Sequence, residues 1–446
     1  MALTGIQIYK LLPQTNCKEC GFPTCLAFAM KLAAKQVELS ACPYVTPEAK
    51  TQLAESAAPP IRLVVLKSDG YEAKAGNEVV LFRHEKTYYN KPGLFIRVYD
   101  NQPSEAIKAM VTEADTYAVN YVGIDLTLDG FAVASTSGDP NAFAAAVQTV
   151  RAASKRPIIL MSRDVNVVKA GLNALKGETP LIYGSDASNW EGFADLAKEY
   201  KAAVGVVAGS LAEMAELTEK IKARGIEDLV IDPGGRDLGA GLAMGTTIRR
   251  LAVKKNFRAL GFPVITFPGD TGDPGMESVQ AAQAITKYAG FIVLDHFNPA
   301  TIYPLLVLRQ NIYTDPQKPI QVQPGIYEIN APKPEHPVLV TTNFSITYFS
   351  VANEVEGSGL PAWLLVTDAE GMSVLTAWAA GKFDAERIAK AVKGFNVADK
   401  VSRKRIVLPG HVAVLSGELE SELPDWEIRV GPREAVDLPA FMKQVL

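Results

Sequence analysis

The sequence is poor in the two residues that most often bind transition metals. Its 446 residues include only four histidines and four cysteines, and no cysteine lies beyond position 42. No apolar run reaches the roughly 20 residues of a membrane-spanning helix, and the N-terminal residues lack the basic start and long apolar stretch of a secretory signal. A net charge of −4 offers no basic surface for nucleic acid. We therefore expect a cytoplasmic protein with no membrane and no nucleic-acid partner.

Apolar residues make up 48% of the chain, which is enough for large hydrophobic cores. The length suits about three domains, and we place them at 1–58, 59–322 and 323–446. In the second region, continuous apolar runs alternate with helical segments at the spacing of repeated βα units, which indicates a parallel sheet covered on both faces. We expect a TIM (β/α)8 barrel, with an open doubly wound sheet as the alternative. The expected strands are 61–66 and 79–84 as a lead-in, then 93–98, 120–126, 157–162, 179–184, 204–209, 228–232, 262–267 and 291–295.

The third region predicts a smaller Rossmann-like or flavodoxin-like α/β domain. A proline-rich stretch, 317–337, is typical of a linker, and short strands then alternate with helices. Ligands of such sheets lie beyond the carboxyl ends of the strands, and the segments there are rich in glycine and small hydroxyl residues. Neither GxGxxG nor a P-loop is present, which disfavours NAD and ATP. The strand-end segments are 341–349, 367–378, 408–420 and 430–435.

The four cysteines are spaced Cys17-x2-Cys20-x4-Cys25-x16-Cys42, and a proline follows the last of them. Thiolates are the ligands of iron–sulfur clusters and of structural zinc. A zinc site built from cysteines alone usually has two CxxC pairs, and only Cys17 and Cys20 form such a pair here. The x4 gap and the terminal Cys-Pro favour a [4Fe–4S] cluster, with zinc as the alternative.

Aspartates end several of the apolar runs in the middle domain. Because the active sites of TIM barrels lie at the carboxyl ends of the strands, such a set could hold a polar ligand. Aspartate is also a preferred N-cap of a following helix, and for each residue taken alone the cap is the better interpretation. The residues are Asp125, Asp164, Asp186, Asp232, Asp270 and Asp295.

The combination of these features resembles the large subunit of the corrinoid/iron–sulfur proteins of the anaerobic acetyl-CoA pathway. The resemblance covers the whole chain and rests on the cysteine spacing, the central barrel, and the segments TDAEGMSVLTAW and LPGHVAVLSGELE. It implies a [4Fe–4S] cluster on Cys17, Cys20, Cys25 and Cys42, and a cobamide in the C-terminal domain. The implied cobamide contacts are Thr342, Asn343, Gly371, Met372, Ser373, Val374, Leu375, Thr376, Gly410, His411, Val412, Gly431, Pro432 and Arg433.

The same resemblance implies a function and partners. In that family the cobalt accepts a methyl group from methyltetrahydrofolate through a separate methyltransferase and passes it to acetyl-CoA synthase/CO dehydrogenase, while the cluster returns Co(II) to Co(I). The barrel is implied to dock a small subunit, which makes a heterodimer. The chain would thus be a methyl carrier that acts with partner enzymes.

Many B12 proteins supply an axial histidine from an Asp-x-His-x-x-Gly motif, and this sequence has none: His411 has no aspartate two residues before it. We therefore expect a base-off cobamide without a protein histidine on cobalt, as the resemblance implies. Two other interpretations stay open. The chain could be an iron–sulfur electron-transfer protein whose α/β domains bind a flavin or a partner, or its barrel could itself bind methyltetrahydrofolate.

Overall fold

The chain folds into two compact units in the computed structural model, which describes residues 5–33, 37–50, 53, 59–315 and 320–445. The first unit contains Met1–Ala118 and Thr127–Tyr313, and the second contains Val119–Leu126 and Thr314–Leu446. The domain boundaries at 58 and 322 stay a prediction. None of the described helices is long and apolar enough to cross a membrane.

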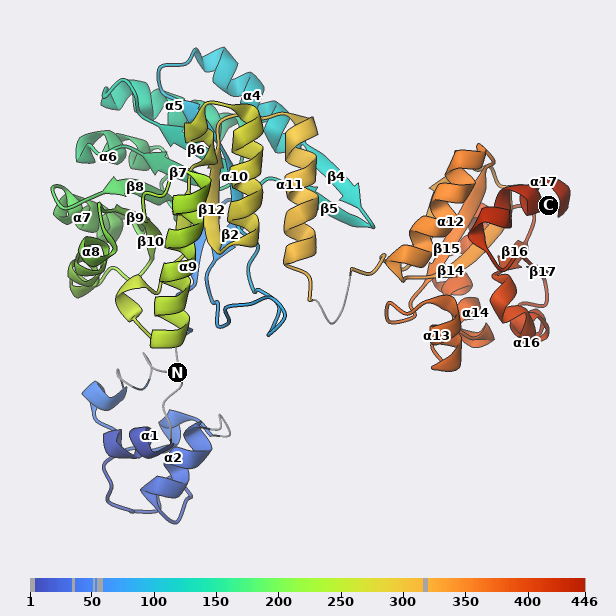
Figure 1. The fold of residues 1–446 in the computed structure, drawn as a ribbon, viewed down its shortest axis with the longest axis horizontal. Coiled ribbons are helices and arrows are strands. Elements are labelled where there is room, and N and C mark those ends of the chain that lie inside the picture. Colours follow the sequence, from blue (N-terminus) through green and yellow to red (C-terminus); the bar gives the residue numbers. More distant parts are fainter. Residues whose placement is uncertain (1–4, 34–36, 51–52, 54–58, 316–319, 446) are drawn as a thin grey trace. The chain divides into compact units, whose positions relative to one another are not determined.

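The first unit is built around a closed barrel of eight parallel strands, which confirms the TIM barrel (Figure 1). The strands are almost entirely apolar and buried, as expected when a parallel sheet is covered on both faces. Their order around the barrel is β10-β11-β12-β3-β6-β7-β8-β9. The strands are β3 (Gly93–Tyr99), β6 (Gly130–Ala134), β7 (Ile158–Met161), β8 (Leu181–Ser185), β9 (Ala203–Val207), β10 (Leu229–Asp232), β11 (Val264–Thr266) and β12 (Ala289–Leu294).

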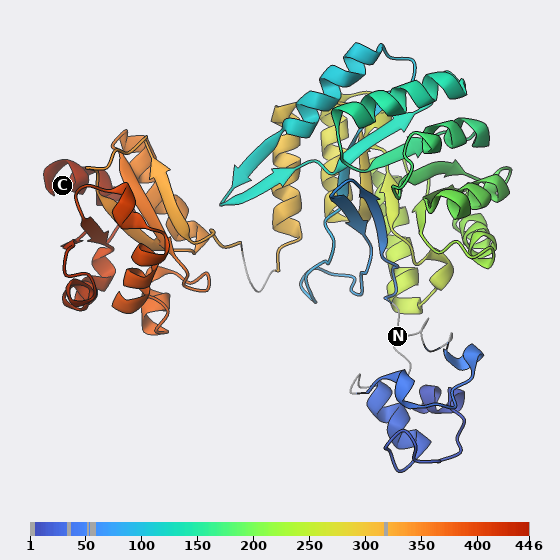
Figure 2. The ribbon, with the colours of Figure 1, turned by 180° about the vertical axis from the view of Figure 1, so that it is seen from behind.

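Helices surround the barrel strands (Figure 2). Several begin at an aspartate, serine or asparagine whose side chain accepts a hydrogen bond from a backbone N–H of the first turn, and Asp164 is one of these N-caps. The helices are α4 (Ser104–Thr116), α5 (Pro140–Ala153), α6 (Val165–Asn173), α7 (Trp190–Tyr200), α8 (Leu211–Ala223), α9 (Leu238–Lys255), α10 (Pro274–Thr286) and α11 (Pro299–Ile312), with short 3-10 turns η2 (Arg258–Leu260) and η3 (Pro268–Thr271).

An antiparallel hairpin, β1 (Val64–Ser68) and β2 (Tyr71–Ala75), precedes the barrel. Its apolar residues join the same core as the residues inside the barrel, so the hairpin closes one end of it. The strand expected at 79–84 is wrong. The backbone N–H groups of Leu81 and Phe82 both donate to the carboxylate of Glu85 at 3.0 Å, and this local turn takes the place of a strand ladder.

The strand expected at 120–126 is also wrong, because this segment is a separate hairpin of β4 (Ala118–Tyr121) and β5 (Ile124–Thr127). The two strands form a two-stranded sheet of their own, drawn in cyan in Figure 1. The barrel strand at this point is β6, whose five residues are all buried. The segment Val119–Leu126 belongs to the second compact unit.

The C-terminal domain is a five-stranded sheet in the order β13-β15-β14-β16-β17. Strand β13 is antiparallel and the other four are parallel. The order of the parallel strands, β15-β14-β16-β17, matches the first four strands of the flavodoxin-like order 2-1-3-4-5. The prediction of a linker at 317–337 is wrong in part, because β13 lies inside this stretch. Residues 316–319 lie outside the described residues. The strands are β13 (Gly325–Ile329), β14 (Val338–Thr342), β15 (Ala362–Thr367), β16 (Arg405–Leu408) and β17 (Glu427–Val430).

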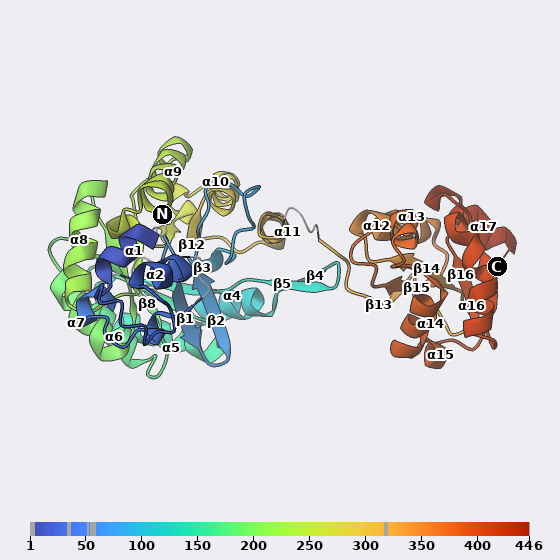
Figure 3. The same cartoon turned by 90° about the horizontal axis from the view of Figure 1, so that it is seen from below.

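Helices cover both faces of this sheet (Figure 3). Helices α12 and α17 pack on one face, and α13, α14 and α16 pack on the other. They are α12 (Ser345–Ser358), α13 (Val374–Ala379), α14 (Ala385–Gly394), α15 (Val397–Lys400), α16 (Ser416–Glu422) and α17 (Leu438–Val445), with η4 (Gly410–Leu415) and η5 (Ala435–Asp437).

The N-terminal residues form two short helices, α1 (Gly5–Leu11) and α2 (Cys25–Ala33), followed by the turn η1 (Leu39–Ala41). They share a small apolar cluster that includes Phe28 and the side chains of Cys25 and Cys42.

Candidate functional site

The main cavity of the C-terminal domain lies at the carboxyl ends of the parallel strands. It is an open cleft with an empty volume of about 960 Å³, open solvent included, and it lies between β14 and β16, which is the switch point of a flavodoxin-like sheet and its usual ligand site. Its walls are mostly apolar and come from the sheet, α12 and the loops that follow β15, β16 and β17. The lining includes Leu339, Val340, Thr341, Ile346, Thr347, Ser350, Val351, Val407, Leu408, Pro409 and Leu438.

Half of the cobamide contacts that the sequence suggests line this cavity. They are Ser373, Val374, Leu375, His411, Gly431, Pro432 and Arg433. The other seven lie close by in the chain but outside the cavity lining: Thr342, Asn343, Gly371, Met372, Thr376, Gly410 and Val412. Contact with a cofactor stays a prediction for all fourteen residues.

Asn343 supports the cavity without lining it. Its side-chain oxygen accepts hydrogen bonds from the N–H groups of Ala369 and Gly371, each at 2.9 Å, so this buried amide holds the loop after β15. Gly371 has a positive φ of 72°, and a Cβ there would lie 2.5 Å from the amide nitrogen of Gln321. The left-handed backbone conformation therefore favours glycine at this position, and a side chain there would also displace the Gln321 side chain.

Gly410 and Gly431 bring the loops after β16 and β17 into close contact. The N–H of Gly410 donates to the carbonyl of Pro432 at 2.9 Å, and that of Gly431 donates to the carbonyl of Leu408 at 2.8 Å. A Cβ on Gly410 would lie 2.5 Å from the Gly431 oxygen. The two glycines thus shape the rim of the cavity through the backbone.

One residue of the cavity lining, Thr341, has a buried hydroxyl group without a partner in the described part of the chain. The side-chain oxygen of Thr342 is also buried and lacks a hydrogen bond among these residues, but Thr342 does not line the cavity. An unpaired buried hydroxyl is costly, so a ligand with polar atoms that reaches Thr341 would be stabilised. Arg433 stands exposed at the rim, where a guanidinium can meet a phosphate. An apolar slot with an unpaired hydroxyl in its lining and a cation at its mouth fits an amphipathic macrocycle with a phosphate-bearing tail, such as a cobamide.

One wall of the cavity was expected only in part: Ile346 and Thr347 lie in the strand-end segment 341–349, whereas Ser350 and Val351 lie beyond it. The first turns of α12, through Ile346, Thr347 and Val351, form the side of the cavity that faces the sheet. The segment 341–349 was recognised as following a strand, but no spacing in the sequence tells which helix of an α/β domain stands away from its sheet to leave a cavity.

The four cysteines lie in the same small N-terminal region. Cys25 is the first residue of α2 and its N–H donates to the side-chain oxygen of Asn16 at 2.8 Å, while the Asn16 N–H donates to the Cys25 sulfur at 3.4 Å. Cys25 and Cys42 are buried and Cys17 is exposed. No group of three or more potential metal ligands is gathered in the described residues, so the thiols lie near one another in the chain without converging on one point.

The loop between α1 and α2 has an unusual backbone. Gln14, Asn16 and Lys18 have φ values of 58°, 51° and 68°, and Gly21 has 82°. Left-handed residues other than glycine are uncommon, and loops that place left-handed residues among ordinary ones turn their N–H groups inward to surround anions, including iron–sulfur clusters. This geometry and the four thiols fit an anionic metal–thiolate centre.

At the barrel mouth, Arg97 lies on the inner side of β3 with its side chain almost fully buried. Its Nε donates to Asp295 at 2.6 Å and one Nη donates to Asp270 at 2.7 Å. Burial alone would lower the pKa of Arg97, but the two carboxylates outweigh it and raise that pKa above its ordinary value. Burial, together with the hydrogen bond to Asp295, raises the pKa of Tyr99 to about 12.

A second arginine continues this network. Arg236 donates to both oxygens of the fully buried Asp232, at 2.8 and 2.6 Å, and to Asp270 at 3.1 Å. The hydrogen bonds to Asp232 raise the pKa of Arg236. Asp232, Asp270 and Asp295 are thus each paired with an arginine, which engages the carboxylates that could otherwise bind a polar ligand. Of the other strand-end aspartates, Asp125 lies on the β4–β5 hairpin and Asp186 accepts from the N–H and hydroxyl of Ser188.

Asp100 gives the barrel mouth a measurable pH dependence. Burial alone would raise its pKa, but hydrogen bonds from Ser135, Thr136 and Ser137 outweigh this and hold the pKa at about 2. Because the folded pKa lies below the ordinary value of 3.8, the stabilisation is complete above about pH 4 and is lost as the pH falls towards 2.

We expect Asp100→Asn to lower the stability of the barrel by about 2 kcal/mol at pH 7, because charge-assisted hydrogen bonds are lost. The difference from the wild type should narrow as the pH falls from 4 to 2, where the wild-type carboxylate also loses its charge. Thermal unfolding across this pH range measures it. A gap that stays constant down to pH 2 would show that the carboxylate charge is not what stabilises this loop.

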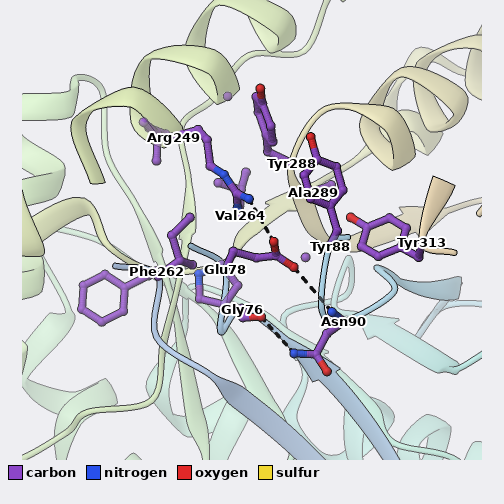
Figure 4. A pocket seen from close by; sticks show the side chains of 15 residues that line it. Gly76, Glu78, Tyr88, Asn90, Arg249, Phe262, Val264, Tyr288, Ala289 and Tyr313 are labelled. Carbon is purple, nitrogen blue, oxygen red and sulfur yellow. Dashed lines mark hydrogen bonds and ion pairs between the residues drawn. The ribbon is translucent and has the colours of Figure 1, made fainter. Parts of the chain in front are cut away.

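A pocket at the other side of the barrel is filled by its own side chains (Figure 4). Glu78 and Arg249 form an ion pair at 2.9 Å with both side chains buried, and the rings of Tyr88 and Tyr288 lie within 5.5 Å and 5.0 Å of the guanidinium. Glu78 also accepts from the N–H of Tyr89 at 2.8 Å, and Arg249 donates to the carbonyl of Val80. These groups satisfy one another, so the pocket is a structural closure.

Comparison with known proteins connects these sites. Residues 63–442 match the family described as CO dehydrogenase/acetyl-CoA synthase delta subunit, and residues 12–44 match a family described as a putative Fe–S cluster. The corrinoid/iron-sulfur protein large subunit of Moorella thermoacetica is 45% identical over 443 residues, 99% of each chain. This chain belongs to the family of corrinoid/iron–sulfur protein large subunits. The resemblance found from the sequence is confirmed.

The family extends to archaea. The acetyl-CoA decarbonylase/synthase complex subunit gamma of Archaeoglobus fulgidus is 34% identical, covering 98% of this chain and 97% of that protein. Among solved structures, dihydropteroate synthase from Vibrio fischeri covers 57% of this chain and all of that one, at 13% identity and a TM-score of 0.39. Such a score carries no argument about function, and the barrel rests on its own strand pairing.

Proposed function

We propose that this chain is a methyl carrier with a cobamide in the C-terminal cavity and a [4Fe–4S] cluster on Cys17, Cys20, Cys25 and Cys42. The observation that carries the proposal is the cavity at the switch point of the sheet, with an unpaired buried hydroxyl in its lining and Arg433 at its rim. When bound, the cobamide supplies a cobalt that accepts a methyl group from methyltetrahydrofolate and yields it to acetyl-CoA synthase, and the cluster supplies the electron that restores Co(I).

The chain's own residues bind and orient the cofactor. The apolar walls of β14 and α12 exclude water from its buried part, Thr341 offers a hydrogen bond in the lining, and Arg433 neutralises a phosphate at the rim. Gly410 keeps the loops after β16 and β17 together at the rim, because a side chain at this position would press against the backbone of Gly431 and Pro432.

We propose that the chain leaves the cobalt without a protein imidazole. His411 lines the cavity and its Nε2 lies 3.7 Å from the carboxylate of Glu434, but the chain has no Asp-x-His-x-x-Gly motif that would present an imidazole to the cobalt. Withholding the lower ligand is how the protein tunes the metal.

The cluster region is proposed to close around its cofactor. The strained loop between α1 and α2 carries Cys17 and Cys20 and could fold over the buried sulfurs of Cys25 and Cys42. Backbone N–H groups of that loop would then donate to the sulfurs, as Asn16 already does to Cys25.

The proposed partners act where the cofactors are. A small subunit would form a heterodimer with this chain, a separate methyltransferase would deliver the methyl group from methyltetrahydrofolate, and acetyl-CoA synthase/CO dehydrogenase would receive it. Family membership supports these partners. The pairing of Asp232, Asp270 and Asp295 with arginines at the barrel mouth supports a separate folate-binding protein.

Metal analysis of the anaerobically purified chain, supplied with cobamide, tests the proposal. We expect about four irons and about one cobalt per chain, and a Co(II) EPR spectrum without nitrogen coupling that is the same in His411→Ala. Zinc in place of iron would refute the cluster. A flavin spectrum without cobalt would favour an electron-transfer protein, and nitrogen coupling that disappears in His411→Ala would refute the proposal that no protein imidazole binds the cobalt.

A further inference from the structure

The β4–β5 hairpin is an unusual insertion. Its sequence lies between α4 and β6 of the barrel, yet its two strands pair with each other and not with a barrel strand. Its residues Val119–Leu126 are grouped by their contacts with Thr314–Leu446 in the second compact unit. A two-stranded hairpin is at best marginally stable alone, so these contacts are what keep it folded.

The tip of the hairpin is strained. The two residues between the strands, Val122 and Gly123, have φ values of 48° and 80°, as a two-residue type I′ turn requires. Such turns favour Asn-Gly, and a β-branched residue in the left-handed region is an outlier. The turn therefore has a residue that an isolated hairpin would disfavour, and strain of this kind persists only when the surroundings hold it in place.

Contacts within the second unit hold this tip. Val122 is 7% exposed and belongs to an apolar cluster with Val322 and Ile329. Its carbonyl accepts a hydrogen bond from the N–H of Gln323 at 3.3 Å. A Cβ on Gly123 would lie 2.9 Å from both the Gln323 Cβ and the Tyr327 hydroxyl oxygen, so the backbone of the turn lies directly against this surface.

We propose that the hairpin is a latch, with Val122 seated in a socket formed by Val322, Gln323, Tyr327 and Ile329. The latch attaches the C-terminal domain to the rest of the chain at a second place, besides the connection that follows Tyr313. Valine is disfavoured by the geometry of the turn, but its apolar side chain is buried when the hairpin is seated. Release would expose Val122, remove the contact of Tyr121 with the same apolar cluster and break the hydrogen bond from Gln323. The inference is independent of which cofactor fills the cavity.

Hydrogen exchange of the full-length protein, measured by mass spectrometry, tests the latch with Val122→Asn. Asparagine suits a type I′ turn better than valine does, but its amide is costly in an apolar socket. We expect the segment 119–126 and the Gln323 amide to exchange at least about tenfold faster than in the wild type, since an opening equilibrium tenfold less favourable raises exchange by that factor. Slow exchange in β16 should be unchanged.

Ala118→Asp is the matched control, because Ala118 is exposed on the same hairpin. It should exchange like the wild type at Gln323. If the Gln323 amide of Val122→Asn exchanges as slowly as in the wild type, the latch is wrong. It is also wrong if exchange accelerates equally in both variants, because any change to the hairpin would then unfold it. Val122→Ile, which keeps an apolar side chain, should retain most of the protection, and a loss as large as that of Val122→Asn would also contradict the proposal.

Discussion

Replacing Thr347 with tryptophan is expected to lower the affinity for cobamide by at least about hundredfold, or about 2.7 kcal/mol. Thr347 lies on α12 and lines the cavity of the C-terminal domain. An indole at this position would occupy space between α12 and the sheet that the cofactor needs. The fold should survive, because the added ring enters space that is already open and does not overpack the core. Cobalt content after reconstitution and a cobamide titration measure the effect.

Asn353→Trp provides the matched control. Asn353 is exposed on the same helix and does not line the cavity, so it adds the same ring to α12 without blocking the site. Its cobalt content should equal that of the wild type. Full cobalt content in Thr347→Trp would mean that the cobamide binds elsewhere. The iron content of both variants should equal that of the wild type, because the cluster cysteines lie in a different region of the chain.

The general position of the cavity in the C-terminal domain was predictable, and its shape was not. The segments after the strands of the C-terminal domain were identified from composition and from the rule that ligands lie beyond the carboxyl ends of parallel strands. Ser373, His411 and Arg433 indeed line the cavity. Asn343 also follows a strand, yet its side-chain oxygen accepts hydrogen bonds from the N–H groups of Ala369 and Gly371. Whether such a residue lines the cavity or supports a neighbouring loop depends on the direction of its side chain, which the sequence does not show.

The barrel itself was predictable from its apolar runs, but the partners of its aspartates were not. Arg97 sits within the apolar run of β3 and bonds Asp295, which is 198 positions away in the sequence. Nothing local distinguishes an aspartate that caps the next helix, such as Asp164, from one that pairs with an arginine across the barrel. These charges come together only when the barrel closes. Local sequence patterns therefore do not predict which arginine pairs with which aspartate.

The two misplaced strands have separate physical reasons. The run 79–84 is apolar enough for a strand, but Glu85 binds its backbone N–H groups and ends any ladder. The run 120–126 does form strands, but Val122 and Gly123 reverse the chain in its middle. A valine at a left-handed position is the opposite of a turn signal, so this reversal depends on tertiary contacts that the sequence does not display.

Glu78→Gln is expected to destabilise the barrel by about 3–5 kcal/mol, because it leaves the buried guanidinium of Arg249 without its anion. Arg249 is 3% exposed, and the rings of Tyr88 and Tyr288 lie beside its guanidinium (Figure 4). The exchange of the slowest amides of β3 and β12 reports the free energy of unfolding of the barrel, and it avoids a two-state treatment of a chain with several units.

The double variant Glu78→Gln/Arg249→Met decides whether the charge or the packing matters. If the unpaired charge is the main cost, removing the guanidinium as well should recover part of the stability that Glu78→Gln loses, since a buried ion pair replaced by uncharged groups is often close to neutral. Lys169→Met is the surface control: its ion pair with Glu199 spans 3.9 Å between half-exposed side chains, and the change should stay within about 0.5 kcal/mol. A double variant less stable than Glu78→Gln alone would instead assign the stabilisation to the stacking of Arg249 on the two tyrosines.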